Sequence, residues 1–320
     1  MRTGLFLTPG AARTAYQVGA AQGLLAAGVV PDVVAASSVG ALNGAFVATG
    51  QVDRLAALWS TWTDADIFGV DWAALLRGGV LWAPNLLHNR PQRRDVIDRH
   101  LADDRLRPGV RFRVDLADLT TGEAPVFEWP GAPLPLADGV NASVAVPGAI
   151  APVEALGDQW ADGLTIDGFP LEAALLVTGV ERAFVLGVAP RHPSSAPQAN
   201  VLRAVLRAAE WNQYSETWLG LERTEARNRV LRAWAADRAA AVAAVEEEVG
   251  DADLRARLLA EVDRVYGDPA LAYGRREVEV VPVLPDEEIE MFFTDYDPAR
   301  SRRLLDLGRR DAERAVAALG

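Results

Sequence analysis

The stretch that most constrains this chain is residues 33–44, which read V-V-A-A-S-S-V-G-A-L-N-G. A short apolar run ends in two serines, and a small-residue helical pattern starts directly after them. This pattern predicts a buried strand that turns sharply into a helix, with Ser38 at the turn and with Ala36 and Gly40 as its small neighbours. Two roles for Ser38 are compatible with the pattern: an exposed nucleophile at the turn, or a side chain that caps the helix.

A second strand–helix unit precedes this one. Residues 4–7 are predicted to form a buried strand, residues 8–12 a turn, and residues 14–25 a helix of small and apolar residues. Two successive units of this kind predict a parallel sheet with right-handed crossovers. The turn at 8–12 would then face Ser38 at the carboxyl edge of the sheet, where open α/β sheets place their sites.

The chain continues as an α/β pattern up to a change of composition near residue 200. The elements expected in this part are a helix at 52–62, an irregular stretch at 63–91 that could form a lid or pocket wall, a helix at 94–101, a hairpin at 111–129, a short helix at 140–146, a strand at 183–188 and a loop at 191–200. From 201 to about 264 the pattern is almost entirely helical, with Glu/Arg pairs at spacings of three and four.

A late strand at 277–283 and a closing amphipathic helix at 299–319 complete the pattern. We therefore expect a three-layer α/β fold, in which helices flank a mostly parallel sheet. No internal repeat or disordered linker divides the chain, so we expect a single domain over 1–320. Within it, about 201–275 would be a helical elaboration and 276–320 a closing strand and helix.

Composition excludes several classes of function. The chain has no cysteine, which excludes disulfides and a cysteine nucleophile, and all its basic residues other than histidine are arginine, which excludes a lysine base. A net charge of -12 argues against binding to nucleic acid or to an anionic membrane through a global field, so local apolar contacts would hold a lipid partner. No apolar run of membrane-spanning length and no signal peptide is recognisable, and we expect a cytoplasmic location.

A serine nucleophile requires a general base, and the sequence offers two kinds. The histidines are His88, His100 and His192, each in a stretch typical of surface residues. A Ser38–Asp162–His192 triad is formally available, but folds with such a triad usually place the serine turn after several strands. The other choice is a carboxylate held within hydrogen-bond distance of the serine. Asp162 and Asp167 each stand at a D-G turn, and the residues alone do not decide between them.

Several ordered motifs resemble those of the patatin-like phospholipases, and the resemblance runs from the first strand to the last helix. The family pattern G-G-G-x-[KR]-G is matched by residues 9–14 (P-G-A-A-R-T), G-x-S-x-G-A-L-N by residues 36–43 (A-S-S-V-G-A-L-N), A-S-x-x-x-P-x-x-x-x-P by Ala142 and Ser143 with Pro147 and Pro152, the D-G-G/A segment by residues 162–170 (D-G-L-T-I-D-G-F-P), and the hairpin turn by residues 120–123 (T-T-G-E). Motifs that occur together in this order are far more specific than any one of them.

The resemblance implies a lipid acyl hydrolase, of phospholipase, lysophospholipase or esterase type, that uses a Ser–Asp dyad and an acyl-enzyme. The residues to which it assigns roles are Ser38 as nucleophile, Asp162 rather than Asp167 as general base, the backbone N–H groups of Gly10, Ala11 and Ala12 as oxyanion hole, and Arg13, Gly40 and Gly163 as supporting residues. Arg13 would steady the loop, although a plain salt bridge is the alternative. No metal or cofactor is required, and the implied partner is a lipid or acyl ester, with peripheral membrane contact and no nucleic acid.

The 9–14 loop departs from the family pattern. Pro9 replaces a glycine and has no N–H, while Ala11 and Thr14 carry a Cβ where the pattern leaves room for positive φ. Leu164 replaces a glycine beside the expected base. Loss of one oxyanion donor lowers a rate by about 10²–10³. Two alternatives therefore stay open: a catalytically weak or inactive protein that binds a lipid or partner, and an acyltransferase or thioesterase on the same scaffold.

Overall fold

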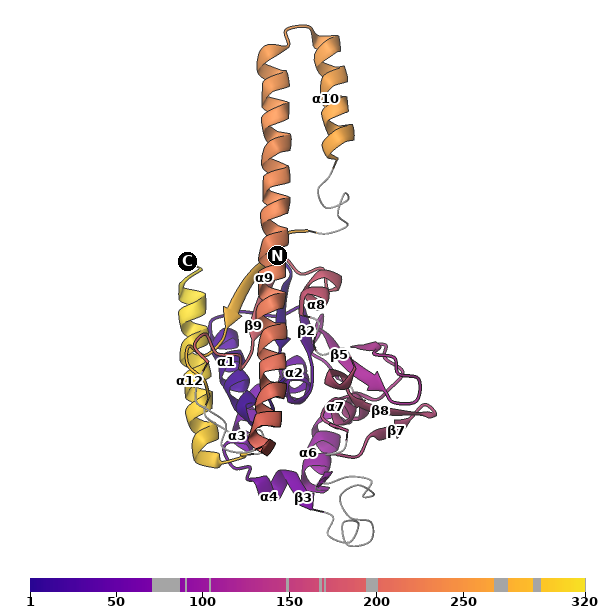
Figure 1. Ribbon diagram of the computed structural model, residues 1–320, viewed down its shortest axis with the longest axis vertical. Helices are drawn as coiled ribbons and strands as arrows, with labels where there is room; N and C mark the ends of the chain where they lie inside the picture. The colour runs from indigo at the N-terminus through magenta and orange to yellow at the C-terminus, as the bar shows by residue number, and fades with distance from the viewer. Residues whose placement is uncertain are drawn as a thin grey trace.

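The computed structural model describes most of the chain. The described residues are 1–70, 87–89, 91–103, 105–147, 150–166, 169, 171–193, 201–267, 276–289 and 295–319. Figure 1 shows an α/β body from which a helical hairpin projects. Residues 71–86, which make up most of the stretch for which we considered a lid, lie outside the described residues, as do 194–200 of the predicted loop.

The body is built around a mixed sheet of eight strands within the described residues. In spatial order they are β10 (Glu279–Val283), β9 (Arg182–Leu186), β1 (Thr3–Leu7), β2 (Val33–Ala36), β5 (Arg111–Asp118), β8 (Asp158–Asp162) and β7 (Val153–Ala155), with β6 (Val126–Trp129) paired to β5. The first five run parallel, β8 and β6 are antiparallel to β5, and β7 is antiparallel to β8. A separate antiparallel pair joins β3 (Phe68–Val70) to β4 (Leu87–Asn89). The predicted mostly parallel α/β sheet is confirmed.

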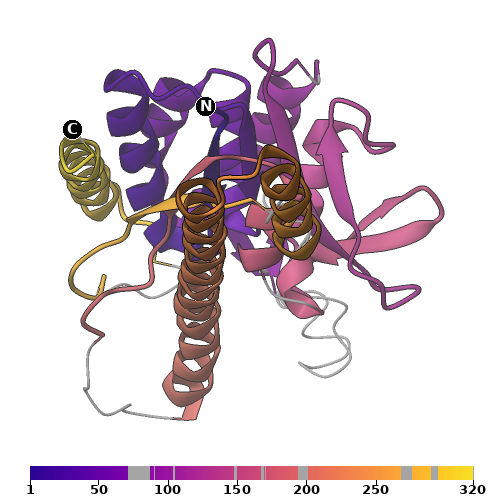
Figure 2. The same ribbon diagram turned by 90° about the horizontal axis from the view of Figure 1, so that it is seen from above.

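Helices cover both faces of this sheet. They are η1 (Ala11–Thr14), α1 (Ala15–Ala26), α2 (Val39–Ala48), α3 (Val52–Trp59), α4 (Asp64–Ile67), α6 (Pro91–Leu101), α7 (Leu136–Ser143), η2 (Gly163–Thr165), α8 (Leu171–Val177), α9 (Val201–Glu248), α10 (Ala252–Tyr266) and α12 (Pro298–Ala317). Side chains alternate along β1, so Leu5 and Leu7 pack in the core shared with α1, α2 and α12, and Phe6 packs on the other face with α8. Figure 2 shows α12 and α9 on different sides of the body.

The helix predicted at 140–146 begins and ends earlier, at Leu136 and Ser143. Pro135 is extended at the N-cap, with φ -54° and ψ 144°, and Asp138 follows in the first turn, where an acidic side chain stabilises the helix dipole. Small-residue spacing alone placed the prediction too late, because it ignored these start signals. The hairpin predicted at 111–129 is confirmed as β5 and β6.

Helix α9 spans 48 residues and serves two parts of the molecule. Its first half lies along the body, and its second half pairs with α10 in the projecting hairpin (Figure 1). At the junction, Asn228 Nδ2 donates to the Val278 carbonyl at 2.7 Å, which ties α9 to the chain just before β10. The helical pattern predicted from 201 to 264 is interrupted once, where Asp251 caps α10 by accepting from the Leu254 N–H at 2.7 Å.

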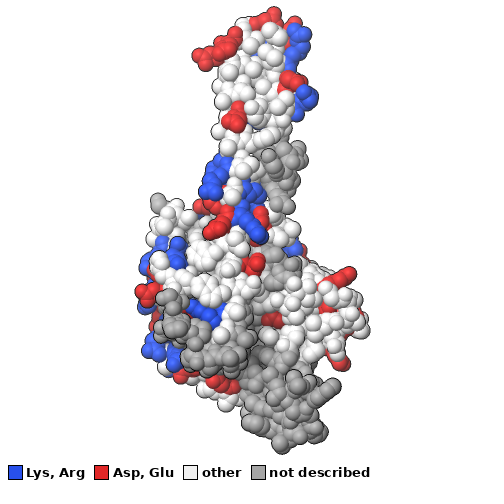
Figure 3. Space-filling view, viewed as in Figure 1, with Lys and Arg blue, Asp and Glu red and all other residues white. Residues whose placement is uncertain are grey.

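Charged side chains are unevenly distributed along the projecting hairpin. In the view of Figure 3 the flank of the hairpin is largely uncharged, and charged side chains gather at its tip and its base. At the base, Arg232 pairs with Glu225 at 2.6 Å and also with Glu277. The hairpin is therefore joined to the body by ion pairs as well as by the continuous helix.

Candidate active site

Sheet register brings Ser38 and Asp162 to the same edge of the sheet. Ala36 of β2 pairs with Val114 of β5, and two residues further along, Leu116 of β5 pairs with Asp162 of β8. Ser38 also lies two residues beyond Ala36, so the two predicted catalytic side chains reach the edge at the same level. Strand β8 runs antiparallel to β5 and pairs only with its last three residues, so Asp162 lies near the carboxyl end of β5.

Ser38 occupies a strained turn between β2 and α2. Its backbone has φ 55° and ψ -137°, a combination that residues with a Cβ rarely adopt. Although Ser38 is the N-cap of α2, its side chain makes no capping hydrogen bond. Its backbone N–H donates instead to the Ser143 hydroxyl at 2.9 Å. Helix capping therefore does not account for Ser38, and its hydroxyl is left for another partner.

Asp162 lies close enough for the Ser38 side chain to affect its pKa, and its carboxyl is buried and only 1% exposed. Burial raises the pKa of Asp162 to about 7, while hydrogen bonds from the Ser38 side chain and the Leu164 N–H act to lower it. Oδ1 accepts from the Leu164 N–H at 3.1 Å, and the buried Oδ2 has no partner at ordinary hydrogen-bond geometry. The Ser38 side chain therefore acts on the pKa of Asp162 without meeting its carboxyl at ordinary hydrogen-bond geometry.

Gly40 and Gly163 are both required by close approach. A Cβ at Gly40 would lie 2.7 Å from the Leu7 carbonyl oxygen and 2.8 Å from that of Thr8, because the first turn of α2 crosses the end of β1. A Cβ at Gly163 would lie 2.6 Å from the Asp115 carbonyl oxygen. Contacts this short with backbone do not occur in folded proteins, so both glycines keep the two turns packed against the sheet.

The 9–14 loop leaves β1 beside Ser38, since β1 pairs in parallel with β2. Gly10 precedes η1, and Ala11 has φ 50°, the left-handed region for which the family pattern uses glycine. Thr14 Oγ1 donates to the Ala11 carbonyl at 2.7 Å. Within the described residues, the N–H groups of Gly10, Ala11 and Ala12 donate no hydrogen bond, as befits the start of a short helix.

A buried polar network lies beneath this loop, and sequence reasoning missed it. Gln17 Nε2 donates to the Thr8 carbonyl at 2.6 Å. Asn43 Nδ2 donates to the Thr14 carbonyl at 3.0 Å and to Gln17 Oε1 at 3.1 Å, and Trp59 Nε1 donates to Asn43 Oδ1 at 3.1 Å. The sequence signal for this network is that Gln17 and Asn43 stand within apolar helices, where both are fully buried. Buried amides are almost always hydrogen-bonded, so they indicate such a network.

Arg13 is buried and contacts helix α9. Its Nη1 donates to the Tyr214 hydroxyl at 2.8 Å and lies 3.0 Å from Glu210 Oε1. The same side chain makes a hydrogen bond to the loop, from Nε to the Gly10 carbonyl at 3.4 Å, in addition to the salt bridge with Glu210. Tyr214 and Glu210 had no sequence signal, since they stand about two hundred positions away.

The histidines take no part in this arrangement within the described residues. His192 is exposed and pairs through its backbone with Glu287, and His100 packs edge-on against Phe46 at 5.8 Å. Burial lowers the pKa of His100. His88 lies in β4, but its side chain is outside the described part of the structure. Asp167, the other candidate base, also lies outside the described residues. No described hydrogen bond joins His192 to Ser38 or Asp162, so the triad has no support.

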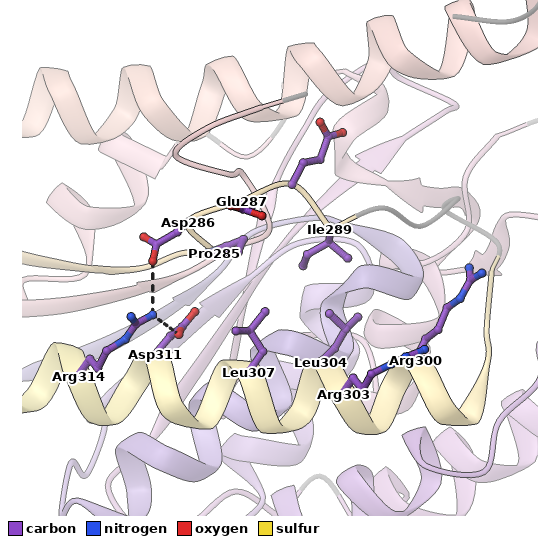
Figure 4. Close-up of a pocket in the computed structure, with 11 residues that line it drawn as sticks. Pro285, Asp286, Glu287, Ile289, Arg300, Arg303, Leu304, Leu307, Asp311 and Arg314 are labelled. Carbon is purple, nitrogen blue, oxygen red and sulfur yellow. Dashed lines mark hydrogen bonds and ion pairs between the residues drawn. The ribbon is translucent and has the colours of Figure 1, made fainter. Parts of the chain in front are cut away.

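Two of the open cavities lie next to α9 and next to α12. One, of about 670 Å³, lies between α9 and residues 190–193, and Trp211, Tyr214 and Trp218 line it. The other, of about 540 Å³, lies between α12 and residues 285–289 (Figure 4). Its wall carries an ion-pair chain from Asp286 to Arg314 to Asp311, and neither Ser38 nor Asp162 lines it. Its mixed charges distinguish it from the first cavity, which is richer in aromatic side chains.

Comparison with known proteins identifies the family. The family model described as patatin-like phospholipase matches residues 5–175, more than half of the chain. The chain belongs to the patatin-like phospholipase family. The match begins within β1, ends within α8, and includes Ser38 and Asp162. The resemblance inferred from the motifs is thereby confirmed.

Relatives of this chain include uncharacterized NTE family proteins of Mycobacterium tuberculosis and Mycobacterium bovis. Each is 28% identical to it over 210 residues, which cover 66% of this chain and 54% of the relative, so the chain spans about half of their length. VipD from Legionella pneumophila aligns in structure with a TM-score of 0.44 and 11% identity, over 99% of this chain and 67% of VipD. Among the described residues, no helix has the length and apolar character needed to cross a membrane.

Proposed function

We propose that this patatin-like protein is a lipid acyl hydrolase in which Ser38 and Asp162 form a catalytic dyad. The observation that carries the proposal is the contact between a serine held at a strained turn and a buried carboxyl whose pKa is raised to about 7. A base with a pKa near the working pH accepts and returns protons efficiently. The family supports an ester-hydrolysing reaction, and the pairing of these two side chains supports the mechanism.

In the first half of the reaction, the Ser38 hydroxyl attacks the ester carbonyl and its proton passes to the Asp162 carboxylate. The carbonyl oxygen becomes an oxyanion, which would be stabilised by the N–H groups of Gly10, Ala11 and Ala12. When the tetrahedral intermediate collapses, the ester C–O bond breaks and the leaving alcohol takes the proton from Asp162. An acyl-enzyme on Ser38 remains.

In the second half, a water molecule replaces the alcohol. Asp162 accepts a proton from this water as its oxygen attacks the acyl carbonyl, and the proton returns to the Ser38 oxygen when the acyl–serine bond breaks. The fatty acid leaves, and both side chains are restored. No metal or cofactor enters any step. An alcohol in place of the water would give acyl transfer by the same path.

The substrate class proposed is a phospholipid, lysophospholipid or smaller lipid ester. With a net charge of -12, the protein has no global attraction for an anionic membrane, so we propose peripheral contact through apolar side chains. Trp211 and Leu219, which are 43% and 39% exposed, line the 670 Å³ cavity next to Tyr214 and provide such a surface.

The test is labelling with a fluorophosphonate probe, which reacts with activated serines. We expect labelling of the wild type, none of Ser38→Ala, and a loss of at least 10³-fold in rate for Asp162→Asn. Ser37→Ala is the matched control, since Ser37 is the adjacent buried serine and its hydroxyl has no hydrogen-bond partner. Equal labelling of wild type and Ser38→Ala would disprove the dyad.

A second candidate, a catalytically weak protein that binds lipid, is favoured by one specific feature. Pro9 supplies no N–H, and Ala11 takes the left-handed backbone of the 9–14 loop with a Cβ in place. If the probe labels Ser38 but short-chain and long-chain esters are not turned over, this candidate replaces the hydrolase. Turnover that rises on addition of alcohol acceptors, with formation of the new ester, would identify a transferase.

A further inference from the structure

Helix α9 contacts the 9–14 loop through one buried arginine. Arg13 is 2% exposed, and its guanidinium meets both the Tyr214 hydroxyl, at 2.8 Å, and Glu210 Oε1, at 3.0 Å. The guanidinium carbon lies 5.7 Å from the centre of the Tyr214 ring. On its other side Arg13 Nε donates to the Gly10 carbonyl. One side chain thus joins the start of the loop to a helix far away in the sequence.

The α9 side of this contact is itself held in place. Arg207 lies one turn before Glu210 and pairs with its other oxygen at 3.1 Å. Arg207 Nη2 also donates to Glu288, after β10, at 2.8 Å, and its guanidinium stacks over Trp211 at 5.2 Å. Each charge in this cluster has an opposite partner, which a buried charge such as that of Arg13 requires.

The loop that Arg13 anchors has an intrinsic need for support. A non-glycine residue at positive φ persists only where its surroundings determine it, and Ala11 has φ 50°. Thr14 and the Gln17–Asn43 network hold the later part of the loop. The Gly10 carbonyl accepts from the Arg13 backbone N–H at 3.3 Å and from Arg13 Nε, and the guanidinium of Arg13 connects this start of the loop to α9.

We propose that Tyr214 and Glu210 are positioning residues that act through Arg13. They hold the N–H groups of residues 10–12 where the oxyanion forms, which makes the first half of α9 part of the catalytic machinery. The inference rests on the hydrolase proposed above. It extends the site beyond the segment matched by the family model, which ends at residue 175.

The variants that test this are Tyr214→Phe, which removes the acceptor for Arg13, and Glu210→Gln, which removes its charge partner. Donors that are displaced from the oxyanion weaken only the transition state, so we expect kcat on a p-nitrophenyl ester to fall about tenfold with KM changed less than twofold. The rate of fluorophosphonate labelling should fall by a similar factor.

Two matched controls make the same chemical changes away from Arg13. Glu247→Gln alters an exposed glutamate in the last turn of α9, and Tyr266→Phe removes the hydroxyl of a tyrosine at the end of α10. Neither side chain has a hydrogen bond to the 9–14 loop within the described residues. Both controls should keep kcat within twofold of the wild type.

Variants that also carry Arg13→Met separate a positioning role of Glu210 from a general loss of stability. When Glu210→Gln is added to Arg13→Met, kcat should fall by less than a further twofold, because both changes break the same connection between the loop and α9. A further tenfold fall in that background would mean that Glu210 acts by another route and would overturn the proposal.

A second measurement does not depend on turnover. Hydrogen exchange of a peptide that covers residues 8–17 should be at least fivefold faster in Tyr214→Phe and Glu210→Gln than in the two controls. If the wild type is labelled and active, but Tyr214→Phe and Glu210→Gln match the two controls in hydrogen exchange and in kcat, the positioning role is overturned and the hydrolase stands. A wild type that the probe does not label would overturn the hydrolase, and the positioning role with it.

Discussion

The Ser143 hydroxyl accepts a hydrogen bond of 2.9 Å from the backbone N–H of Ser38. Ser143 is fully buried at the end of α7, and Ser38 stands at the strained turn before α2. The bond joins two parts of the chain 105 positions apart. Because a turn in an unfavourable backbone region needs external support, this bond holds the proposed nucleophile in its orientation.

Replacement of Ser143 by alanine should therefore impair both stability and catalysis. An unsatisfied buried N–H destabilises by about 1–3 kcal/mol, and we expect a loss of about 1–2 kcal/mol in the free energy of unfolding. The labelling rate of Ser38 should fall about tenfold, because the turn can relax. Denaturant unfolding and probe kinetics measure the two effects.

Ser37→Ala is the control for that prediction. Ser37 is as buried as Ser143, but its hydroxyl has no hydrogen-bond partner. Removal of an unpaired buried hydroxyl is neutral or stabilising, so the free energy of unfolding should stay the same or rise by up to ~1 kcal/mol. Equal losses in the two variants would show that the Ser143–Ser38 bond has no special role.

The raised pKa of Asp162 predicts a pH dependence of reactivity. Only the ionised carboxylate accepts the Ser38 proton, and its pKa is about 7. The labelling rate should therefore be constant above pH 8 and fall about tenfold per pH unit below pH 6. Probe kinetics from pH 5 to pH 9, with Glu247→Gln as a control that should keep the same profile, measure it. A profile that is flat across pH 7 is incompatible with Asp162 as the base.

Asp162→Asn should be inactive yet more stable at alkaline pH. Between about pH 4 and pH 7 the folded protein keeps a proton on Asp162 that the unfolded chain has released, so the group's contribution to stability is lost as the pH rises through 7. Above pH 7 the buried carboxylate destabilises the fold, and an amide removes that penalty. We expect the melting temperature to rise by about 2–8 °C at pH 8 and by much less at pH 5.

Asp158→Asn, on the same strand, is the control for the stability effect. Asp158 is partly exposed at the start of β8, so its melting temperature should change by less than about 1 °C at either pH. If Asp162→Asn is no more stable than Asp158→Asn at pH 8, the ionised Asp162 carboxylate does not destabilise the fold as its raised pKa implies.

Local patterns were sufficient to predict the elements that carry Ser38. The apolar run before the two serines, the small residues after them and the alternation along 111–119 are each set within about ten residues, and β2, α2 and β5 formed as expected. Asp162 was chosen over Asp167 by family resemblance alone. Its burial depends on β8 pairing with β5, which no local pattern encodes.

Contacts between distant segments were not predictable from one sequence. The motif around Arg13 predicts a supporting role, but the sequence around its partner Tyr214 indicates only a charged helix and no contact with the loop. Similarly, Ser143 appeared in a motif without a role, because its contact with Ser38 depends on how α7 packs beside α2. A single sequence reports periodicity and turns, while the side chains that meet at the edge of the sheet are decided by packing.

Close packing at Gly40 gives a prediction about the turn itself. In Gly40→Ala the new Cβ would lie 2.7 Å from the Leu7 carbonyl oxygen, so α2 must move away from β1 and carry Ser38 with it. We expect a loss of about 1–3 kcal/mol in stability and a labelling rate at least tenfold lower. Gly250→Ala is the control, because nothing lies within 4 Å of a Cβ there and its φ is not positive, so both quantities should stay unchanged. If Gly40→Ala unfolds and reacts like Gly250→Ala, the approach of α2 to β1 does not set the position of Ser38.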